Sequence, residues 1–215
     1  GDFQTSAGIQ GFYIQDATGD ANAATSDGIF VFTGTTDNTV SAGDSVHVTG
    51  YARERFSQTT LNGSNSDTAV VPAANIINCG TGSVTAVDVT MPFASTTFPE
   101  QYEGMLVRFP QSLVIAEYFN YDQFGEIVLA LPLTGEDRPH TPTAVVEPGA
   151  PAIARAAENA VRRITLDDNQ GGSNPATLRH PNGNPFSLAN MFRGGDLVAN
   201  ATGVLGYDFS LYRIY

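Results

Sequence analysis

Short runs of apolar residues, interleaved with polar ones, recur along the chain and predict β-strands. The runs are rich in β-branched and aromatic residues and are bounded by Gly, Asp, Asn and Ser, as strands separated by turns are. A recurrence of about 8–16 residues is typical of a β-sandwich or a small β-barrel. The predicted strands cover residues 11–16, 28–32, 45–49, 105–109, 112–116, 126–130 and 163–166.

One segment has helical periodicity instead. Between residues 150 and 163, the apolar positions Ile153, Ala157 and Val161 follow one another at helical spacing, and Pro151 suits the first turn of a helix. The sequence therefore predicts a mainly β fold with one substantial helix.

The two halves of the sequence share a pattern. In each half a Gly-Asp turn precedes an apolar strand that ends in Thr-Gly, which is typical of a small Greek-key barrel whose strands bend at glycine. Such self-similarity predicts two tandem OB-like Greek-key β-barrels, residues 1–83 and 84–215, the second with a hairpin and the helix inserted. The matching segments are 12–16 and 164–168, 43–46 and 195–198, 49–50 and 202–203, and Phe56 and Phe209.

The charge balance is strongly acidic. The 215 residues include 22 Asp and Glu against 10 basic residues, all of them Arg, and the net charge is −12. This charge repels phosphates, so it argues against a high-affinity nucleic-acid surface and suits solubility in a salty medium. No apolar run is long enough to span a membrane, so no membrane partner is expected. The chain begins at Gly1 without an export signal, which favours a piece of a longer, processed protein.

The single cysteine, Cys79, has no partner for an internal disulfide. It follows the apolar residues Ile76 and Ile77, and no histidine is close to it in the sequence. We therefore expect a buried structural thiol rather than a nucleophile.

Several segments together carry a family resemblance. The most specific is Tyr-Glu-Gly-Met-Leu-Val at 102–107, and the others are residues 11–16, 24–32, 108–110, 124–126, 202–205 and 212–214. They resemble the OB-fold region of ExeM/NucH-type bacterial extracellular nucleases. The resemblance implies a secreted, non-catalytic accessory module that positions the nuclease domain or the nucleic-acid substrate.

In that family the region lies N-terminal to an endonuclease/exonuclease/phosphatase domain, which carries the metal-dependent phosphodiesterase chemistry. The resemblance thus makes a C-terminal nuclease domain of the same parent chain the expected partner. Residues 1–4 resemble only the end of the family's first OB strand. The first barrel is therefore expected to be incomplete.

The residues that phosphodiester hydrolysis would need do not form a recognisable set. This chemistry uses carboxylates and Asn to hold Mg²⁺, with a histidine as general acid or base. His47, His140 and His180 lie in unrelated contexts. Residues 19–22, Gly-Asp-Ala-Asn, match a nuclease pattern but have no Ser-Asp-His partner. The chain alone is therefore not expected to be an enzyme.

An acidic loop is the best candidate for a metal site. Its oxygen-bearing residues alternate in a way that lets a tight loop direct several oxygens at one Ca²⁺. The candidate ligands are Asp16, Thr18, Asp20, Asn22 and Asp27. An ordinary hairpin loop closed by Asx-turns is the alternative, because the same residue types favour such turns. The corresponding loop of the second half, residues 167–175, is acidic but lacks the alternation.

Exposed aromatic and arginine side chains are candidates for weak binding of single-stranded nucleic acid. OB barrels stack bases on aromatic rings and place arginines near the phosphates. The candidates are Tyr13, Tyr51, Arg53, Arg55, Tyr207, Tyr212 and Arg213. The alternative is that most of these rings pack in the barrel core.

Three functional hypotheses follow from these patterns. The first is the accessory module of a secreted nuclease, and the second is a Ca²⁺-stabilised structural spacer of an extracellular protein without substrate contact. The third is a free-standing hydrolase, which would need carboxylates and a histidine converging in a cleft. Arginines grouped with aromatic rings on one face would favour the first hypothesis. Arginines paired with carboxylates would favour the second.

Overall fold

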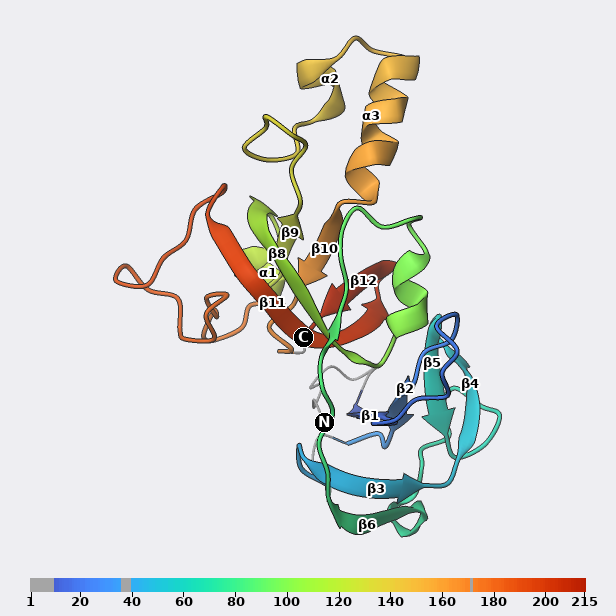
Figure 1. Ribbon diagram of the computed structural model, residues 1–215. Coiled ribbons are helices and arrows are strands. Elements are labelled where there is room, and N and C mark those ends of the chain that lie inside the picture. The colour runs from blue at the N-terminus through green and yellow to red at the C-terminus, as the bar shows by residue number, and fades with distance from the viewer. Residues whose placement is uncertain (1–9, 36–39, 171) are drawn as a thin grey trace.

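A computed structural model describes residues 10–35, 40–170 and 172–215, and it is mainly β (Figure 1). The helical segments are short apart from α3. They are η1 (Ala73–Asn75), η2 (Phe98–Tyr102), α1 (Tyr121–Phe124), α2 (Pro142–Val145) and α3 (Ala150–Ala160). The strands are β1 (Gly11–Gln15), β2 (Gly28–Phe32), β3 (Asp44–Val48), β4 (Tyr51–Arg55), β5 (Gln58–Asn62), β6 (Ile76–Thr81), β7 (Val87–Asp88), β8 (Leu106–Glu117), β9 (Ile127–Ala130), β10 (Arg163–Leu166), β11 (Leu197–Asp208) and β12 (Leu211–Ile214).

Five strands of the second half close into a β-barrel. Their order is β8-β9-β10-β12-β11, and β11 returns to pair with β8. β10 and β12 run parallel, whereas the other neighbours in the barrel are antiparallel. This barrel is compatible with an OB-fold.

Strand β8 is continuous where the sequence predicts two strands around Pro110. Proline has no N–H to donate to a β-ladder, so it is confined to edges and bulges. The partner strand β11 is irregular at this point: the register shifts between Ala199 and Ala201, and Asn200 has a φ of 53°. The bulge lets β8 pass Pro110 without ending.

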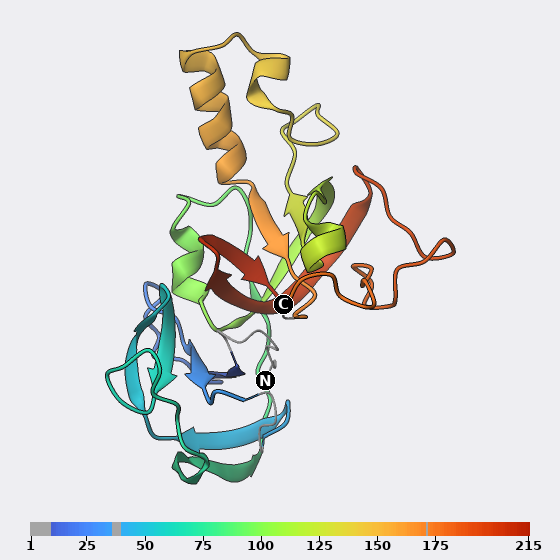
Figure 2. The same ribbon diagram turned by 180° about the vertical axis from the view of Figure 1, so that it is seen from behind.

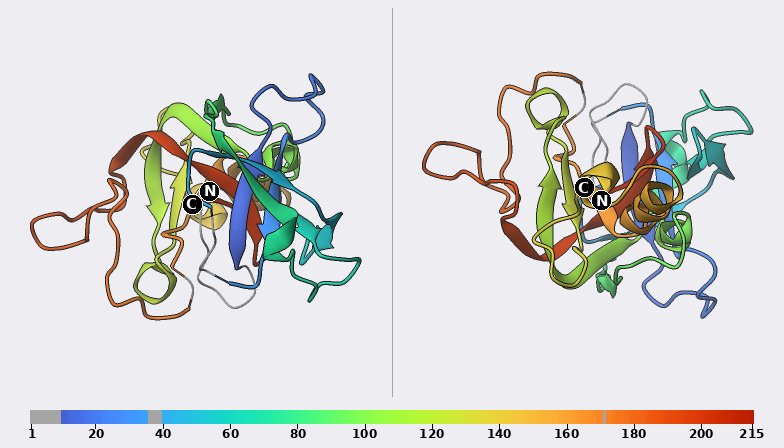
Figure 3. Two further views of the ribbon diagram at one scale, coloured as in Figure 1. Left: turned by 90° about the horizontal axis from the view of Figure 1, so that it is seen from below. Right: turned by 90° about the horizontal axis from the view of Figure 1, so that it is seen from above.

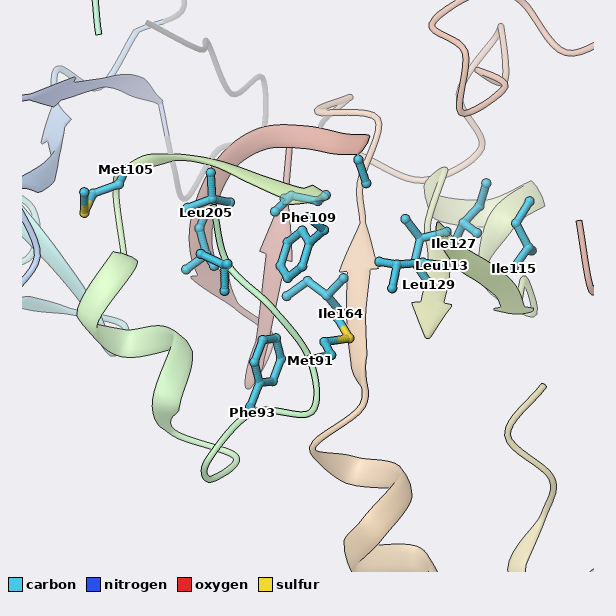
Figure 4. Packing of buried hydrophobic residues seen from close by; sticks show 14 of the residues in the cluster. Met91, Phe93, Met105, Phe109, Leu113, Ile115, Ile127, Leu129, Ile164 and Leu205 are labelled. Atoms are coloured by element: carbon cyan, nitrogen blue, oxygen red, sulfur yellow. The ribbon is translucent and has the colours of Figure 1, made fainter. Parts of the chain in front are cut away.

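The barrel interior is filled by the largest apolar cluster of the molecule. Phe109, Ile164 and Leu205 come from three strands, and Met91 and Phe93 close the same region from the segment that precedes β8 (Figure 4). All five are buried. Burial of such side chains contributes about 1.5–3 kcal/mol each, so this cluster is the main source of the barrel's stability.

The strands of the first half repeat the pairing pattern of the barrel. β1 pairs antiparallel with β2, β2 pairs parallel with β5, and β4 pairs antiparallel with β5. The same relations join β9 to β10, β10 to β12, and β11 to β12. By this pattern β1 corresponds to β9. The predicted match of residues 12–16 with residues 164–168 would make β1 correspond to β10, so that match is wrong.

The first half is not a closed barrel in the part that the structure describes. β3 leaves the four-stranded sheet and pairs with β6 in a separate two-stranded sheet. The break lies at Thr49-Gly50, between β3 and β4, whereas β11 continues through the matching Thr202-Gly203. The tandem-barrel arrangement is therefore not confirmed. The expectation about residues 1–4 falls outside the described residues.

Two hairpins preserve the repeat most closely. Arg55 pairs with Gln58, and Asp208 pairs with Leu211, so Phe56-Ser57 and Phe209-Ser210 are both two-residue loops. All four loop residues have φ between 48° and 64°. Such type I′ turns match the twist of the strands but favour Asn-Gly, because a positive φ is costly for a bulky residue. The predicted match of Phe56 with Phe209 is confirmed.

Helix α3 begins at the predicted residue and ends three residues earlier than predicted, at Ala160. With α2 it projects from the barrel as a helical hairpin (Figures 1 and 2). None of its residues is buried, and Ile153 is 71% exposed. Among the described residues, no helix is long and apolar enough to cross a membrane.

The two halves meet along a tight junction. A Cβ atom at Gly28 would lie 2.3 Å from the backbone of Gly104. The two backbone segments can therefore approach this closely only because both residues are glycine. A small cluster also joins the halves, because Val204 and Tyr215 of the barrel pack on buried rings of β1 and β2. The boundary at residues 83/84 stays a prediction.

Candidate nucleic-acid interface

Three of the predicted interface residues lie in the interior. Tyr13 packs against Phe30 and Tyr215, and its hydroxyl accepts a hydrogen bond from Gln58 Nε2 at 3.0 Å. Arg55 and Arg213 are also buried. A buried side chain cannot stack on a base or reach a phosphate, so the structure corrects the expectation that these three residues are exposed.

Arg213 is the centre of a buried ion cluster. It is 2% exposed, and Nη1 donates to Glu126 Oε1 at 2.8 Å and to Asp167 Oδ2 at 2.5 Å. Nη2 donates to the carbonyl oxygen of Asp208 at 3.0 Å. Burial raises the pKa of Asp167, although the charge of Arg213 opposes that rise. The arginine that the sequence suggests for phosphate binding is instead buried and neutralises two carboxylates.

The β4 candidates are divided between surface and interior. The Arg55 guanidinium lies 3.7 Å from the centre of the Phe32 ring, and Nε donates to the carbonyl oxygen of Asp67 at 2.8 Å. Arg53 forms an ion pair with the Asp67 carboxylate at 2.8 Å. Tyr51 alone of the three is an exposed side chain without an ion pair. The three residues are therefore not a combined site for a base and a phosphate.

Tyr207 and Tyr212 form the aromatic wall of a shallow groove of about 460 Å³. Their rings meet edge to face at 4.9 Å, and Arg163 lines the same groove. Arg163 also donates to Glu117 at 3.2 Å, and the Tyr212 hydroxyl donates to Glu100 at 2.6 Å. Of the predicted interface, this pair is the part that the structure brings together.

The acidic loop is closed by its own hydrogen bonds. Asp16 Oδ1 accepts from the N–H and the hydroxyl of Thr18 at 2.9 and 2.8 Å, and these bonds lower the pKa of Asp16. The backbone N–H of Asp20 donates to Asp27 Oδ1 at 3.0 Å, and that of Asn22 donates to Asp20 Oδ1 at 2.8 Å. The Asp16–Thr18 and Asp20–Asn22 bonds are the Asx-turns of the alternative interpretation, and the bond to Asp27 closes the loop. A Ca²⁺ site here stays a prediction.

The histidines lie apart. His47 is exposed on β3, His140 Nε2 is 3.4 Å from an Asp137 carboxylate oxygen, and His180 stacks edge to face on Phe192. Within residues 10–35, 40–170 and 172–215, no three His, Cys, Asp or Glu side chains are grouped to hold a metal. Cys79 is exposed on β6, so the expectation of a buried thiol is wrong. β6 belongs to a two-stranded sheet that leaves its outer face open to solvent.

Most arginines are engaged with carboxylates. Seven of the ten form ion pairs with carboxylates of the described residues, namely Arg53, Arg108, Arg138, Arg155, Arg162, Arg163 and Arg213. This is the pattern that favours a structural spacer over a charge-driven nucleic-acid interface.

The sequence interpretation missed one surface, which lies on the long connection between β10 and β11. Residues 169–195 are the longest stretch of the sequence without Asp or Glu, and they contain Arg179, His180 and Arg193. A charge count along the sequence, rather than for the whole chain, would have found it.

Comparison with known proteins leaves the family open. No family model, no curated protein and no solved structure matches the chain.

Proposed function

We propose that this chain is a non-catalytic, OB-like accessory module of a secreted bacterial nuclease. In this role it holds a C-terminal nuclease domain of the same parent chain, or its nucleic-acid substrate, in position. The observation that carries the proposal is the closed five-strand barrel, whose strand order β8-β9-β10-β12-β11 is compatible with an OB-fold. OB barrels present loops and strand faces to nucleic acids, so the architecture suits such a role.

Two further observations support a role without chemistry. Each histidine of the chain stands apart from the other two, and His140 and His180 are engaged by Asp137 and Phe192. The groove beside Tyr207 and Tyr212 offers aromatic rings but no histidine. An aromatic surface of this kind binds rather than cleaves, because cleavage needs a positioned acid, base or metal.

The proposal is tested first on the purified chain. We expect no cleavage of single- or double-stranded DNA or RNA in Mg²⁺, Mn²⁺ or Ca²⁺. Cleavage that His140→Ala or His180→Ala abolishes would overturn the proposal and make the chain an enzyme.

The accessory role itself requires the parent polypeptide with and without residues 1–215. We expect the shortened protein to cleave a small diester at the original rate and to be slower on long single-stranded substrates. Equal rates on both substrates would contradict the role of this region.

A second candidate function is a structural spacer without substrate contact, stabilised by Ca²⁺. The seven arginines paired with carboxylates favour it, because they leave few cations for an anionic ligand. The spacer requires that Ca²⁺ raise the melting temperature and that no nucleic acid bind at low salt. The accessory module requires neither.

A further inference from the structure

The β10–β11 connection is a long segment that projects from the side of the barrel as an open loop (Figures 1 and 2). It lies beside α1, on the side of the molecule opposite the β4–β5 hairpin (Figures 1, 2 and 3). Apart from isolated bridges, its residues 172–195 have no regular structure. Structureless connections of this length are uncommon in compact domains and are usually functional or disordered.

This connection is packed rather than loose, because aromatic rings fix it to α1. Tyr121 contacts the rings of Phe186 and Phe192 at 5.5 and 4.9 Å, and its hydroxyl donates to the carbonyl oxygen of Arg179 at 2.8 Å. Tyr118, which follows the end of β8, also contacts Phe192, with the ring centres 6.0 Å apart. Residues around 118–121 and 179–193 thus form one continuous surface, which we call the aromatic–arginine surface.

The charge of this surface differs from that of the remaining protein. Arg179 and Arg193 are exposed, and neither forms an ion pair within the described residues. Burial raises the pKa of Asp168, although the nearby charge of Arg179 opposes that rise, and the backbone N–H of Arg193 donates to Asp196. Even with these neighbours, the acid-free connection has a net charge of +2 from Arg179 and Arg193, in a chain whose net charge is −12.

The same surface exposes flat and apolar side chains. Phe119 is 84% exposed, and Tyr118, Phe186, Leu188 and Met191 are exposed as well. Exposed apolar side chains that gather on one surface mark a binding site more often than exposed apolar side chains that are scattered singly. Exposed rings on the same surface as two guanidinium groups that form no ion pair among the described residues suit a ligand that has both π-faces and negative charge.

We propose that the aromatic–arginine surface binds single-stranded nucleic acid, with Phe119 stacking on a base and Arg193 contacting a phosphate. The inference rests on the proposed function only in naming the substrate that the module would hold. Single strands fit better than duplexes, because their bases are free to stack. An acidic protein partner would use the arginines but would gain nothing specific from the exposed ring of Phe119.

The test is a fluorescence-anisotropy titration of the purified chain with labelled oligo-dT and oligo-U, from about 20 to about 300 mM salt. We expect measurable binding at low salt. Phe119→Ala should weaken it about fivefold or more, as loss of one stacked base does. Arg193→Gln should lower the slope of log K against log salt by about one, as loss of one phosphate contact does.

Two variants serve as matched controls. Phe56→Ala removes an exposed phenylalanine on the opposite side of the molecule, and Arg138→Gln removes an exposed arginine that is paired with Asp137. Both should bind as the unaltered chain does. Circular-dichroism melting of all four variants shows whether a loss of binding reflects unfolding.

Several outcomes would overturn the inference. These are no binding at the lowest salt, equal losses in the control variants, stronger binding to a duplex, or equal competition by poly-glutamate. A loss confined to Tyr207→Ala and Tyr212→Ala would move the site to the groove and would also overturn it. Cleavage of the bound strand would overturn the non-catalytic role alone. Absence of binding would leave the positioning of a nuclease domain to be judged by the parent-protein assay.

Discussion

The backbone N–H of Thr59 donates to Oε1 of Glu103 at 3.1 Å, and this bond joins the two halves of the chain. Glu103 is 3% exposed, and no hydrogen-bond partner for its Oε2 lies among the described residues. Burial, together with the charges of Glu100 and Glu54, raises the pKa of Glu103 to about 9. A proton on Oε2 would turn the repulsion with Glu100 into a hydrogen bond.

The first prediction concerns pH. Folded Glu103 keeps a proton that the unfolded chain loses near the ordinary Glu pKa of 4.5, so the folded state binds more protons up to about pH 9. The free energy of unfolding therefore falls with rising pH across this window, by up to about 1.4 kcal/mol per pH unit from this group. Glu103→Gln should remove that slope, and urea unfolding between pH 5 and 9 measures it.

The matched control is Glu147→Gln, an exposed residue between α2 and α3. Its pH profile should follow that of the unaltered chain, which also contains the buried carboxylates around Arg213. If Glu103→Gln and the unaltered chain have parallel profiles, Glu103 is ionised in the folded state and this reading of the junction is incorrect.

The second prediction concerns the two Phe-Ser turns. Replacing Phe209 by Asn and Ser210 by Gly places the residues that a type I′ turn favours at two positions of positive φ, where Phe and Ser cost about 1–2 kcal/mol each. Phe209 is 78% exposed, so little packing is lost. We expect the melting temperature to rise by about 2–4 °C for each kcal/mol gained. A lower melting temperature would show that the Phe209 ring stabilises the fold through its contacts.

The third prediction concerns the buried ion cluster. Arg213→Met leaves Glu126 and Asp167 without their cation, and breaking a buried pair in this way costs about 3–5 kcal/mol. Arg138→Gln removes an exposed pair at 3.8 Å and should cost less than about 1 kcal/mol. Urea unfolding at neutral pH compares the two variants. Equal small losses would mean that the cluster contributes little to stability.

The fourth prediction concerns Ca²⁺. We expect the acidic loop to bind Ca²⁺ weakly if at all, so that millimolar Ca²⁺ raises the melting temperature slightly at most. Asp20→Asn should abolish any rise, because Asp20 is a central ligand of the predicted site. Binding to the folded state alone adds about 1–3 kcal/mol at ten to a hundred times Kd. Identical melting curves in Ca²⁺ and EGTA would leave the loop as a set of Asx-turns.

Local patterns were sufficient for much of the secondary structure. β1, β2, β9 and α3 lie where alternation, turn residues and helical spacing place them, because each depends on interactions within a few residues. Among the predicted strands, the exception at Pro110 depended on Asn200, a residue distant in sequence, whose bulge allows β8 to continue.

Burial of polar side chains was harder to predict. Arg213 is interior because β10 and β12 run parallel, which brings Asp167 beside it, and the β8–β9 turn adds Glu126. Nothing near Arg213 in the sequence indicates these partners. Tyr13 is hidden by Tyr215, again from the far end of the described chain. For such residues the chemical type predicts an interaction but not whether solvent can reach it.

The cluster that joins the halves has a consequence for how the chain unfolds. Tyr13, Phe30 and Phe32 of one half pack with Val204 and Tyr215 of the other. Melting either half would expose apolar rings on its neighbour and lower the neighbour's stability. The two halves are thus coupled into one cooperative unit. A cut between residues 83 and 84 would divide the sequence repeat and would expose the rings of this cluster on both halves.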